Sequence, residues 1–190
     1  MSGDAPIIRY DHLGLAVRSI EKGLVLYRDT FGGVFVAGGD DMRLGMRTVQ
    51  LKLPGDLKIE LLQPLDENSH MAAFLERHGE GFHHATVFVP DVEVMIEKLT
   101  ANGFELVDTD LSAATWRETF VRPKSGFGCL LQIVDSTLDW LSPHPTCTLE
   151  GVLAGQWRWW GNRTWHIDDL PDDYDETRSD VYMPKTPRTG

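Results

Sequence analysis

Cysteine and basic residues are scarce in this chain. Cys129 and Cys147 are the only cysteines among 190 residues, too few for a disulfide framework or a thiolate metal cage, so we expect reduced, structural thiols. The 18 Lys and Arg residues are outnumbered by 29 Asp and Glu, which gives a formal net charge of −11. Phosphate backbones and anionic membrane surfaces repel such a chain. The composition therefore argues against nucleic-acid and membrane partners and favours a small-molecule substrate.

Long apolar runs are missing as well. No segment approaches the roughly 18 consecutive apolar residues that a membrane-spanning helix requires. The first residues have neither the basic start nor the apolar stretch of a signal peptide. We therefore expect a cytoplasmic protein, and a hydrophobic content of 42% is enough for one substantial core.

An internal repeat dominates the chain between His12 and Val134. His12–Val17 is similar to His84–Val89, 72 positions later (84 − 12 = 72), and Lys58–Leu62 is similar to Leu130–Val134 at the same offset (130 − 58 = 72). Each copy has the pattern of a strand, an amphipathic helix and three strands. The sequence predicts an α+β fold, in which paired βαβββ modules form a curved, mixed but mostly antiparallel sheet around a metal-binding cavity.

The repeat also defines the expected domain organisation. We predict one domain over residues 1–137, followed by an extension over residues 138–190 that packs on the domain or on a dimer partner. Within the domain, Ser69 is a plausible N-cap for a connecting helix. The expected parts are module one at about 7–66, the linker helix at about 67–80 and module two at about 81–137.

Four polar positions recur at equivalent places in the two copies. His12 and His84 begin the first strands, and Glu60 and Gln132 follow them at equal separations in otherwise apolar strands (60 − 12 = 132 − 84). A lone strand histidine is more often a hydrogen-bonded core residue than a ligand. Two histidines at equal repeat positions, joined by a carboxylate that is costly to bury alone, favour a divalent metal site instead.

Four segments carry a resemblance to a known family: Asp11–Val17, Ile59–Leu65, Gly79–His84, and Arg122–Ser125 with the following Gly-Cys-Leu-Leu-Gln132. They resemble the vicinal oxygen chelate superfamily, which includes the glyoxalases, bleomycin-resistance proteins and ring-cleaving dioxygenases. The similarity is nearest to methylmalonyl-CoA epimerase and covers roughly residues 8–135. It implies metal ligands at His12, Glu60, His84 and Gln132, a divalent ion of Co, Ni, Zn, Mn or Fe, an acyl-CoA substrate and a homodimer.

The sequence departs from the epimerase pattern at its bases. Gln132 stands where the epimerases carry a glutamate that moves a proton, and Thr48 stands where some bacterial epimerases place a second glutamate; neither side chain is a comparable base near neutral pH. Glu118 is the candidate replacement, because it shares a strand face with Phe120, the repeat mate of Thr48. The alternative for Glu118 is an ion pair with Arg117, Arg43 or Arg47.

The extension and the basic residues bear on the substrate. Lysine and arginine residues are dispersed over the predicted domain, whereas the phosphates of coenzyme A require a cluster, so a smaller or aromatic substrate is the alternative to an acyl-CoA.

The segment Gln156–Trp160, followed by Gly161-Asn162, predicts a strand and turn. Its tryptophans either pack on the outer sheet surface or a dimer partner, or form a lid over an aromatic ligand.

Three functions remain open from the sequence. The first is a metal-dependent isomerase, epimerase or lyase that acts on a carbonyl-containing small molecule through an enolate, with Glu118 as a non-standard base. The second is a non-haem Fe(II) ring-cleaving dioxygenase, since His12, His84 and Glu60 provide two histidines and one carboxylate. The third is a protein that sequesters a drug or another ligand without a metal.

Overall fold

The computed structural model describes residues 7–113, 115–161 and 163–177, so the start of the predicted domain, the end of the predicted extension and the predicted turn residue Asn162 lie outside the described residues. The chain divides into two compact units. Among the described residues, we call 11–84 and 139–177 the His12 unit, and 7–10 and 85–138 the Gln132 unit.

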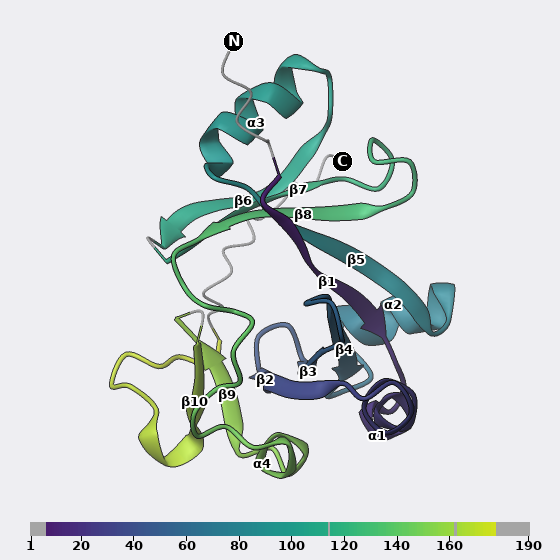
Figure 1. Cartoon of the computed structure of the whole chain (residues 1–190), viewed down its shortest axis with the longest axis vertical. Coiled ribbons are helices and arrows are strands. Elements are labelled where there is room, and N and C mark those ends of the chain that lie inside the picture. Colours follow the sequence, from purple (N-terminus) through teal and green to yellow (C-terminus); the bar gives the residue numbers. More distant parts are fainter. Residues whose placement is uncertain (1–6, 114, 162, 178–190) are drawn as a thin grey trace. The chain divides into compact units, whose positions relative to one another are not determined.

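Two βαβββ repeats follow one another along the chain, as predicted (Figure 1). The first comprises β1 (Arg9–Ala16), α1 (Ile20–Leu24) with the π-helical turn η1 (Val25–Thr30), β2 (Val34–Asp41), β3 (Met46–Lys52) and β4 (Lys58–Pro64). The second comprises β5 (Gly81–Phe88), α3 (Val92–Ala101), β6 (Leu106–Ala113), β7 (Trp116–Val121) and β8 (Leu130–Ser136). Strands β5, β6 and β8 begin 72 positions after β1, β2 and β4 (81 − 9, 106 − 34 and 130 − 58).

Side-chain caps explain where the helices begin. The Ser19 side chain accepts a hydrogen bond from the backbone of α1, and Asp91 accepts two from the backbone of α3. The predicted connecting helix forms as α2 (His70–His78), and Ser69 caps it by accepting from the Ala72 amide. Gly79 follows α2 with a φ of 75°, a backbone conformation that suits glycine and ends the helix.

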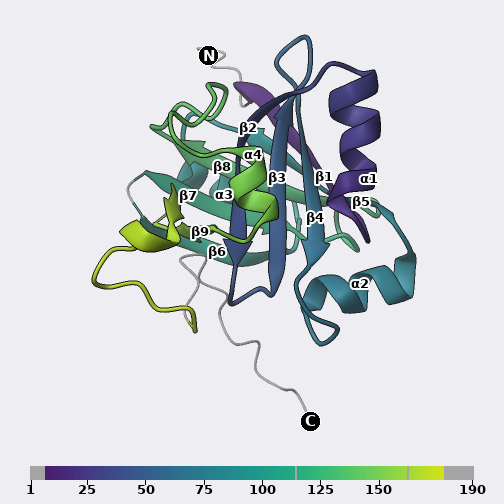
Figure 2. The ribbon, with the colours of Figure 1, turned by 90° about the horizontal axis from the view of Figure 1, so that it is seen from below.

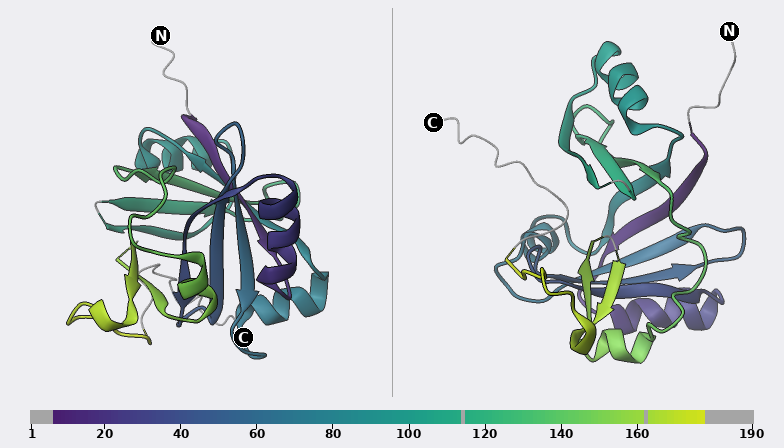
Figure 3. Two further views of the ribbon diagram at one scale, coloured as in Figure 1. Left: turned by 60° about the horizontal axis from the view of Figure 1, so that its bottom comes forward. Right: turned by 90° about the vertical axis from the view of Figure 1, so that its left-hand side faces the viewer.

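The sheet of the His12 unit has the strand order β10-β9-β2-β3-β4-β1 (Figure 3). Strands β2, β3 and β4 pair in antiparallel fashion, β1 runs parallel to β4, and β9 is parallel to β2. The sheet is therefore mixed but mostly antiparallel. It belongs to the α+β class that the sequence predicts.

The two faces of this sheet differ sharply in polarity. On one face, apolar side chains of β3 and β4 pack against α1 and α4 (Leu149–Leu153), which lie over the same side of the sheet in Figure 2. The other face buries polar side chains, because strand side chains alternate between faces. The apolar cluster contains Ile20, Leu24, Val49, Leu51, Ile59, Leu61, Cys147, Leu149, Val152 and Trp157. The buried polar residues of β1, β3 and β4 include His12, Thr48, Gln50, Lys58 and Glu60.

The Gln132 unit has the strand order β5-β8-β7-β6, with α3 packed along it (Figure 1). β8 is antiparallel to β7, and β7 is antiparallel to β6. Asp135 on β8 accepts a hydrogen bond from the Val92 amide at the start of α3, which fixes the helix to the sheet. The apolar cluster between them contains Val87, Val89, Val92, Val121 and Ile133.

The C-terminal segment adds elements to the His12 unit. After α4 come β9 (Trp157–Trp160), β10 (Arg163–His166) and the short helix η2 (Ile167–Asp169), so the predicted strand within Gln156–Trp160 is present and pairs with β10 in an antiparallel hairpin. Arg158 on β9 forms an ion pair with Asp40 on β2, at 3.2 Å. Within the described residues, no helix is long and apolar enough to cross a membrane.

Candidate metal centre

Three donor side chains meet on the His12 unit: His12 from β1, Glu60 from β4 and His84 from β5. His12 Nε2 lies 3.1 Å from His84 Nε2, and Glu60 Oε2 lies 3.6 Å from each of these nitrogens. Bonds of about 2.0–2.2 Å to one ion place neighbouring N and O donors roughly 3–3.6 Å apart. The three side chains therefore fit a single divalent ion, and two imidazoles with one carboxylate suit Fe, Co, Ni, Zn or Mn.

A glycine makes room for the second histidine. Gly14 lies opposite Glu60 in the parallel β1–β4 register. A Cβ atom added to Gly14 would lie 2.2 Å from Cε1 of the His84 ring. The imidazole of His84 thus rests directly against the bare backbone of β1. A larger residue at position 14 would push the ring out of the group of three donors.

Each histidine of the donor group is held by the residue before it. His12 Nδ1 is hydrogen-bonded to Asp11 Oδ2 at 2.8 Å, and His84 Nδ1 lies 3.0 Å from His83 Nδ1. A partner on Nδ1 fixes the ring orientation and leaves Nε2 for a metal. Strand alternation predicts His83 on the opposite face, yet its ring reaches His84, with Phe74 packed against it at a ring-centroid distance of 4.7 Å.

A buried lysine connects the partners of two donors. Lys58 is 1% exposed, and its Nζ lies 2.9 Å from Asp11 Oδ2 and 3.2 Å from Gln50 Oε1. Gln50 Nε2 in turn donates to Glu60 Oε1 at 2.9 Å. The Lys58 ammonium therefore lies between the partner of His12 and the partner of Glu60. We call this chain of contacts the Lys58 network; it comprises Asp11, His12, Gln50, Lys58 and Glu60.

The surroundings of His84 and His83 favour neutral imidazole rings. Burial lowers the pKa of His84 well below its ordinary value, and the nearby His12 and His83 lower it further. Burial also lowers the pKa of His83, against the opposing effect of Glu60. A neutral imidazole is the form that coordinates a metal, so His84 is ready to bind an ion at neutral pH.

Gln132, the predicted fourth ligand, belongs to the Gln132 unit. Its Oε1 accepts a hydrogen bond from the Thr86 hydroxyl, and its Nε2 donates to Glu118 Oε2, both at 2.5 Å. The two hydrogen bonds fix which way the amide points. The structure thus brings together Gln132 and Glu118, two of the residues predicted from the sequence.

Glu118 is a deeply buried carboxyl group. Its side chain is 1% exposed, and Oε2 also accepts a hydrogen bond from Trp116 Nε1 at 2.7 Å. Burial raises the pKa of Glu118, although the hydrogen bonds from Trp116 and Gln132 lower it in part. The sequence also allows Glu118 to form an ion pair with an arginine. Two of the three candidate arginines bind other carboxylates instead: Arg117 donates to Asp135 and Glu93, and Arg47 donates to Asp40.

Thr48 is buried on the polar face of β3. Its Oγ1 accepts a hydrogen bond from Nε1 of Trp159, a half-buried residue of β9, at 2.7 Å. Thr48 therefore contacts the C-terminal segment. The sequence pattern of tryptophans predicted a strand there but gave no signal for this particular contact.

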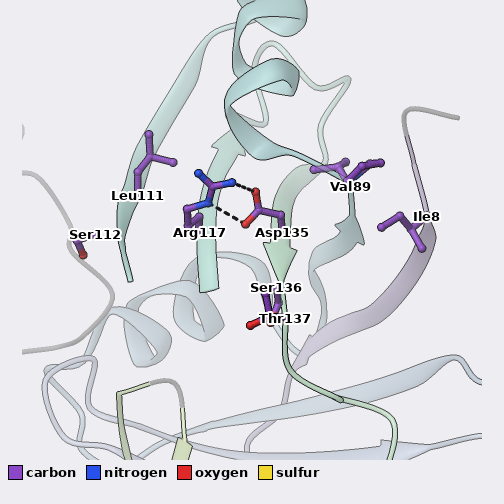
Figure 4. Close-up of a pocket in the computed structure, with 9 residues that line it drawn as sticks. Ile8, Val89, Leu111, Ser112, Arg117, Asp135, Ser136 and Thr137 are labelled. Atoms are coloured by element: carbon purple, nitrogen blue, oxygen red, sulfur yellow. Dashed lines mark hydrogen bonds and ion pairs between the residues drawn. The ribbon is translucent and has the colours of Figure 1, made fainter. Parts of the chain in front are cut away.

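A cavity of about 490 Å³ lies on the Gln132 unit (Figure 4). Arg117 and Asp135 form an ion pair in its wall, on the side of β7 and β8 opposite to Glu118 and Gln132 by strand alternation. The guanidinium already has several acidic partners, including Glu93. Because Arg117 is neutralised by these carboxylates, it does not make the cavity an anion-binding site.

Lys58 and Gln50 contact the donor group or its partners, and the sequence did not indicate this placement. Both are polar residues on strands whose other face is apolar, and no other local signal marks them. A lysine next to a surface turn is ordinarily solvated. Only the fold reveals that Lys58 is buried against Asp11.

The fold and the donor group agree with the comparison with known families. The family model of the Glyoxalase/Bleomycin resistance protein/Dioxygenase superfamily matches residues 11–120. The chain belongs to this superfamily, as its motifs predict.

Relatives of known structure and name narrow the class further. An ethylmalonyl-CoA/methylmalonyl-CoA epimerase from Cereibacter sphaeroides is 32% identical over 129 residues, which are 66% of this chain and 96% of that protein. The mitochondrial methylmalonyl-CoA epimerase of Dictyostelium discoideum is 27% identical over 134 residues, covering 69% of this chain and 80% of that protein. The crystal structure of methylmalonyl-CoA epimerase from Mycobacterium tuberculosis superposes with a TM-score of 0.63 at 30% identity, covering 73% of this chain and 94% of that chain.

These similarities make the protein an epimerase-like enzyme of the superfamily. They also leave a substantial part of it unmatched. The Mycobacterium tuberculosis comparison covers 94% of the other chain but only 73% of this one.

Proposed function

We propose that the protein is a divalent-metal-dependent epimerase that inverts the carbon atom next to the thioester carbonyl of an acyl-CoA. The observation that carries this proposal is the group formed by His12, Glu60 and His84, in a chain similar to ethylmalonyl-CoA/methylmalonyl-CoA epimerase. When bound, a divalent ion supplies Lewis-acid polarisation of a carbonyl oxygen. We assign the fourth ligand position to the amide oxygen of Gln132.

Glu118 is the proposed base. Its carboxylate takes the proton from the carbon next to the carbonyl: the C–H bond breaks, an O–H bond forms on Glu118, and the electron pair passes into the enolate of the substrate. Burial supports this role, because it raises the pKa of Glu118 towards the pH at which a carboxylate is an effective base. The hydrogen bonds from Trp116 and Gln132 orient the carboxylate.

A single base has a consequence for the stereochemistry. A proton returned by Glu118 restores the starting configuration, whereas a proton delivered to the opposite face by water gives the epimer. Gln132 and Thr48 cannot act as bases near neutral pH. We therefore expect exchange of the substrate proton with solvent to outpace inversion.

The test measures both processes in D₂O. Protein loaded with Co, Ni, Zn, Mn or Fe is incubated with single epimers of methylmalonyl-CoA and ethylmalonyl-CoA, deuterium is followed by mass spectrometry, and configuration is followed by chiral separation. We expect deuterium to enter before the epimer accumulates, and Glu118→Gln to abolish both while the metal content is retained. Absence of deuterium with every ion and both substrates would refute the epimerase proposal.

The coenzyme A part of the substrate is tested separately. The scattered basic residues and the net charge of −11 do not favour strong binding of its phosphates. The same thioesters built on N-acetylcysteamine lack these phosphates. Equal turnover of both forms would assign recognition to the acyl group, and turnover of the CoA form alone would assign it to the whole acyl-CoA.

The donor group also supports an alternative function. Two histidines and one carboxylate on one ion form the ligand set of non-haem Fe(II) oxygenases. Oxygen consumption by the Fe(II)-loaded protein with a catechol would favour a ring-cleaving dioxygenase over the epimerase.

A further inference from the structure

The hydrogen bond between Trp159 and Thr48 joins the C-terminal segment to the polar face of the sheet. Thr48 is 3% exposed, so Trp159 covers a hydroxyl that solvent scarcely reaches. Indole Nε1 is a donor only, which means that the Thr48 oxygen must be the acceptor. The contact therefore has one defined direction.

Thr48 lies on the same sheet face as the metal ligand Glu60. Gln50 is directly opposite Glu60 in the β3–β4 register, and Thr48 is two positions from Gln50, opposite Leu62. Diagonal neighbours on one face of a sheet are roughly 7–8 Å apart. This separation suits one small ligand that spans the two positions, with one oxygen at the metal donors and another at Thr48.

The hydrogen bond from Trp159 also determines what Thr48 can offer such a ligand. Once its oxygen accepts from the indole, the hydroxyl proton points away from Trp159, and hydrogen bonds in series strengthen one another. Thr48 then acts as a fixed donor, and its natural acceptor is an anionic oxygen.

Trp159 lies on a strand that is itself held firmly. The neighbouring Arg158 is paired with Asp40, which is 4% exposed and also receives Arg47 at 2.6 Å. Trp157, at the start of the same strand, is buried in the apolar cluster. β9 is thereby fixed beside β2, as Figure 3 illustrates.

We propose that Trp159 is a positioning residue that acts through Thr48, and that the pair selects substrates carrying a carboxylate oxygen beyond the carbonyl that binds at the metal. This inference rests on the proposed function. It assigns to the C-terminal segment, which lies outside residues 11–120 matched by the superfamily model, a part in substrate recognition.

The test uses two simple ligands and needs no turnover. The full-length protein is loaded with Co²⁺ and titrated with malonate, which has two carboxylates, and with acetate, which has one, while the visible absorption of the ion is followed. We expect Trp159→Phe and Thr48→Val each to weaken malonate binding roughly tenfold, because each disturbs a hydrogen bond to a charged oxygen. Acetate binding should change by less than about twofold, since acetate does not reach Thr48.

Matched variants separate this role from general loosening of the hairpin. Trp165→Phe removes another indole hydrogen bond of the same hairpin, from Trp165 to the Trp160 carbonyl, and should leave the malonate-to-acetate ratio unchanged. Thr48→Ser keeps the hydroxyl and should recover most of the affinity lost in Thr48→Val. The double variant of Trp159→Phe and Thr48→Val should bind malonate no more weakly than Thr48→Val alone.

Any of four outcomes would overturn the inference. Two concern single variants: Trp159→Phe binds malonate as tightly as the wild type, or Trp159→Phe and Trp165→Phe lose equal malonate affinity. The other two are equal losses of affinity for malonate and acetate, and losses of malonate affinity that multiply in the double variant. Deuterium exchange reports on the proposed function instead. If the malonate-to-acetate ratios are as expected but no deuterium is exchanged, the binding role of Trp159 stands and the epimerase proposal is refuted. A protein that binds no Co²⁺ refutes both.

Discussion

At the scale of single residues, the three side chains of the candidate metal centre are oriented by neighbours outside the group of three. Lys58 is the centre of this support, since it contacts both Asp11, the partner of His12, and Gln50, the partner of Glu60. Buried charges persist in proteins when they are paired and hydrogen-bonded. The Lys58 network therefore links the stability of the fold to the orientation of the donors.

Replacing Lys58 by methionine should weaken metal binding. The substitution keeps an unbranched chain but removes the ammonium that orients Asp11 and Gln50, so we expect Zn²⁺ affinity to fall about 10- to 100-fold, as for other outer-shell partners of metal ligands. Competition with a chromophoric chelator measures this affinity. Lys52→Met is the control, because Lys52 is one-third exposed and pairs only loosely with Asp56, at 3.8 Å. Equal affinities of the two variants would contradict the role of Lys58.

Glu118 should leave a signature in the pH dependence of stability. Its pKa is raised in the folded protein, so the folded state holds the proton more tightly than the unfolded chain does. The stabilisation from this proton is complete below about pH 4.5 and is lost as the pH rises through the folded-state pKa. Relative to Glu118→Gln, the wild type should thus lose stability across this window. Urea unfolding of both proteins from about pH 4 to 8 measures the difference, and a constant difference would contradict the raised pKa.

At the scale of elements, the repeat was readable from the sequence because the hydrophobic pattern alternates at the same offset in both copies. The cap at Ser69 was readable for a similarly local reason. The Trp159–Thr48 contact was not, because it joins residues 111 positions apart and depends on how β9 docks beside β2. Long-range placement of this kind is set by packing rather than by local pattern.

Helix α4 offers a test of how the C-terminal elements are fixed. Thr148 caps it by accepting a hydrogen bond from the Gly151 amide at 3.1 Å. Thr148→Ala removes this cap and should cost about 1 kcal/mol of unfolding free energy, whereas Thr148→Ser keeps the hydroxyl and should stay close to the wild type. Chemical denaturation of the three proteins decides the point. An alanine variant as stable as the serine variant would show that packing alone holds α4.

At the scale of the whole molecule, the chain combines the region that the superfamily model matches, residues 11–120, with a C-terminal segment outside that match. Residues 139–177 are part of the His12 unit, and they contribute Cys147, Leu149, Val152 and Trp157 to its apolar cluster. The composition could suggest a buried role for the tryptophans. It could not assign them to this particular sheet, since the same aromatic area would serve equally well at a dimer interface.

Ending the chain after Leu138 should abolish cooperative folding. The truncation removes Cys147, Leu149, Val152 and Trp157 from the apolar cluster. Loss of a single large core side chain costs about 2–5 kcal/mol, so loss of several approaches the whole stability of a domain, about 5–15 kcal/mol. Near-ultraviolet circular dichroism and a thermal scan measure the outcome. A truncated protein that melts sharply at the wild-type temperature would show that the segment is an independent addition.

The residue before each histidine of the donor group differs between the two repeats. The offset of 72 that relates the two repeats also relates Asp11 to His83, which therefore occupy equivalent positions (83 − 11 = 72). One copy offers its histidine a carboxylate partner and the other an imidazole. The two histidines of the donor group therefore have unlike partners, a carboxylate for one ring and a second imidazole for the other, so a change of pH or of the residue at position 11 or 83 would not affect the two rings equally.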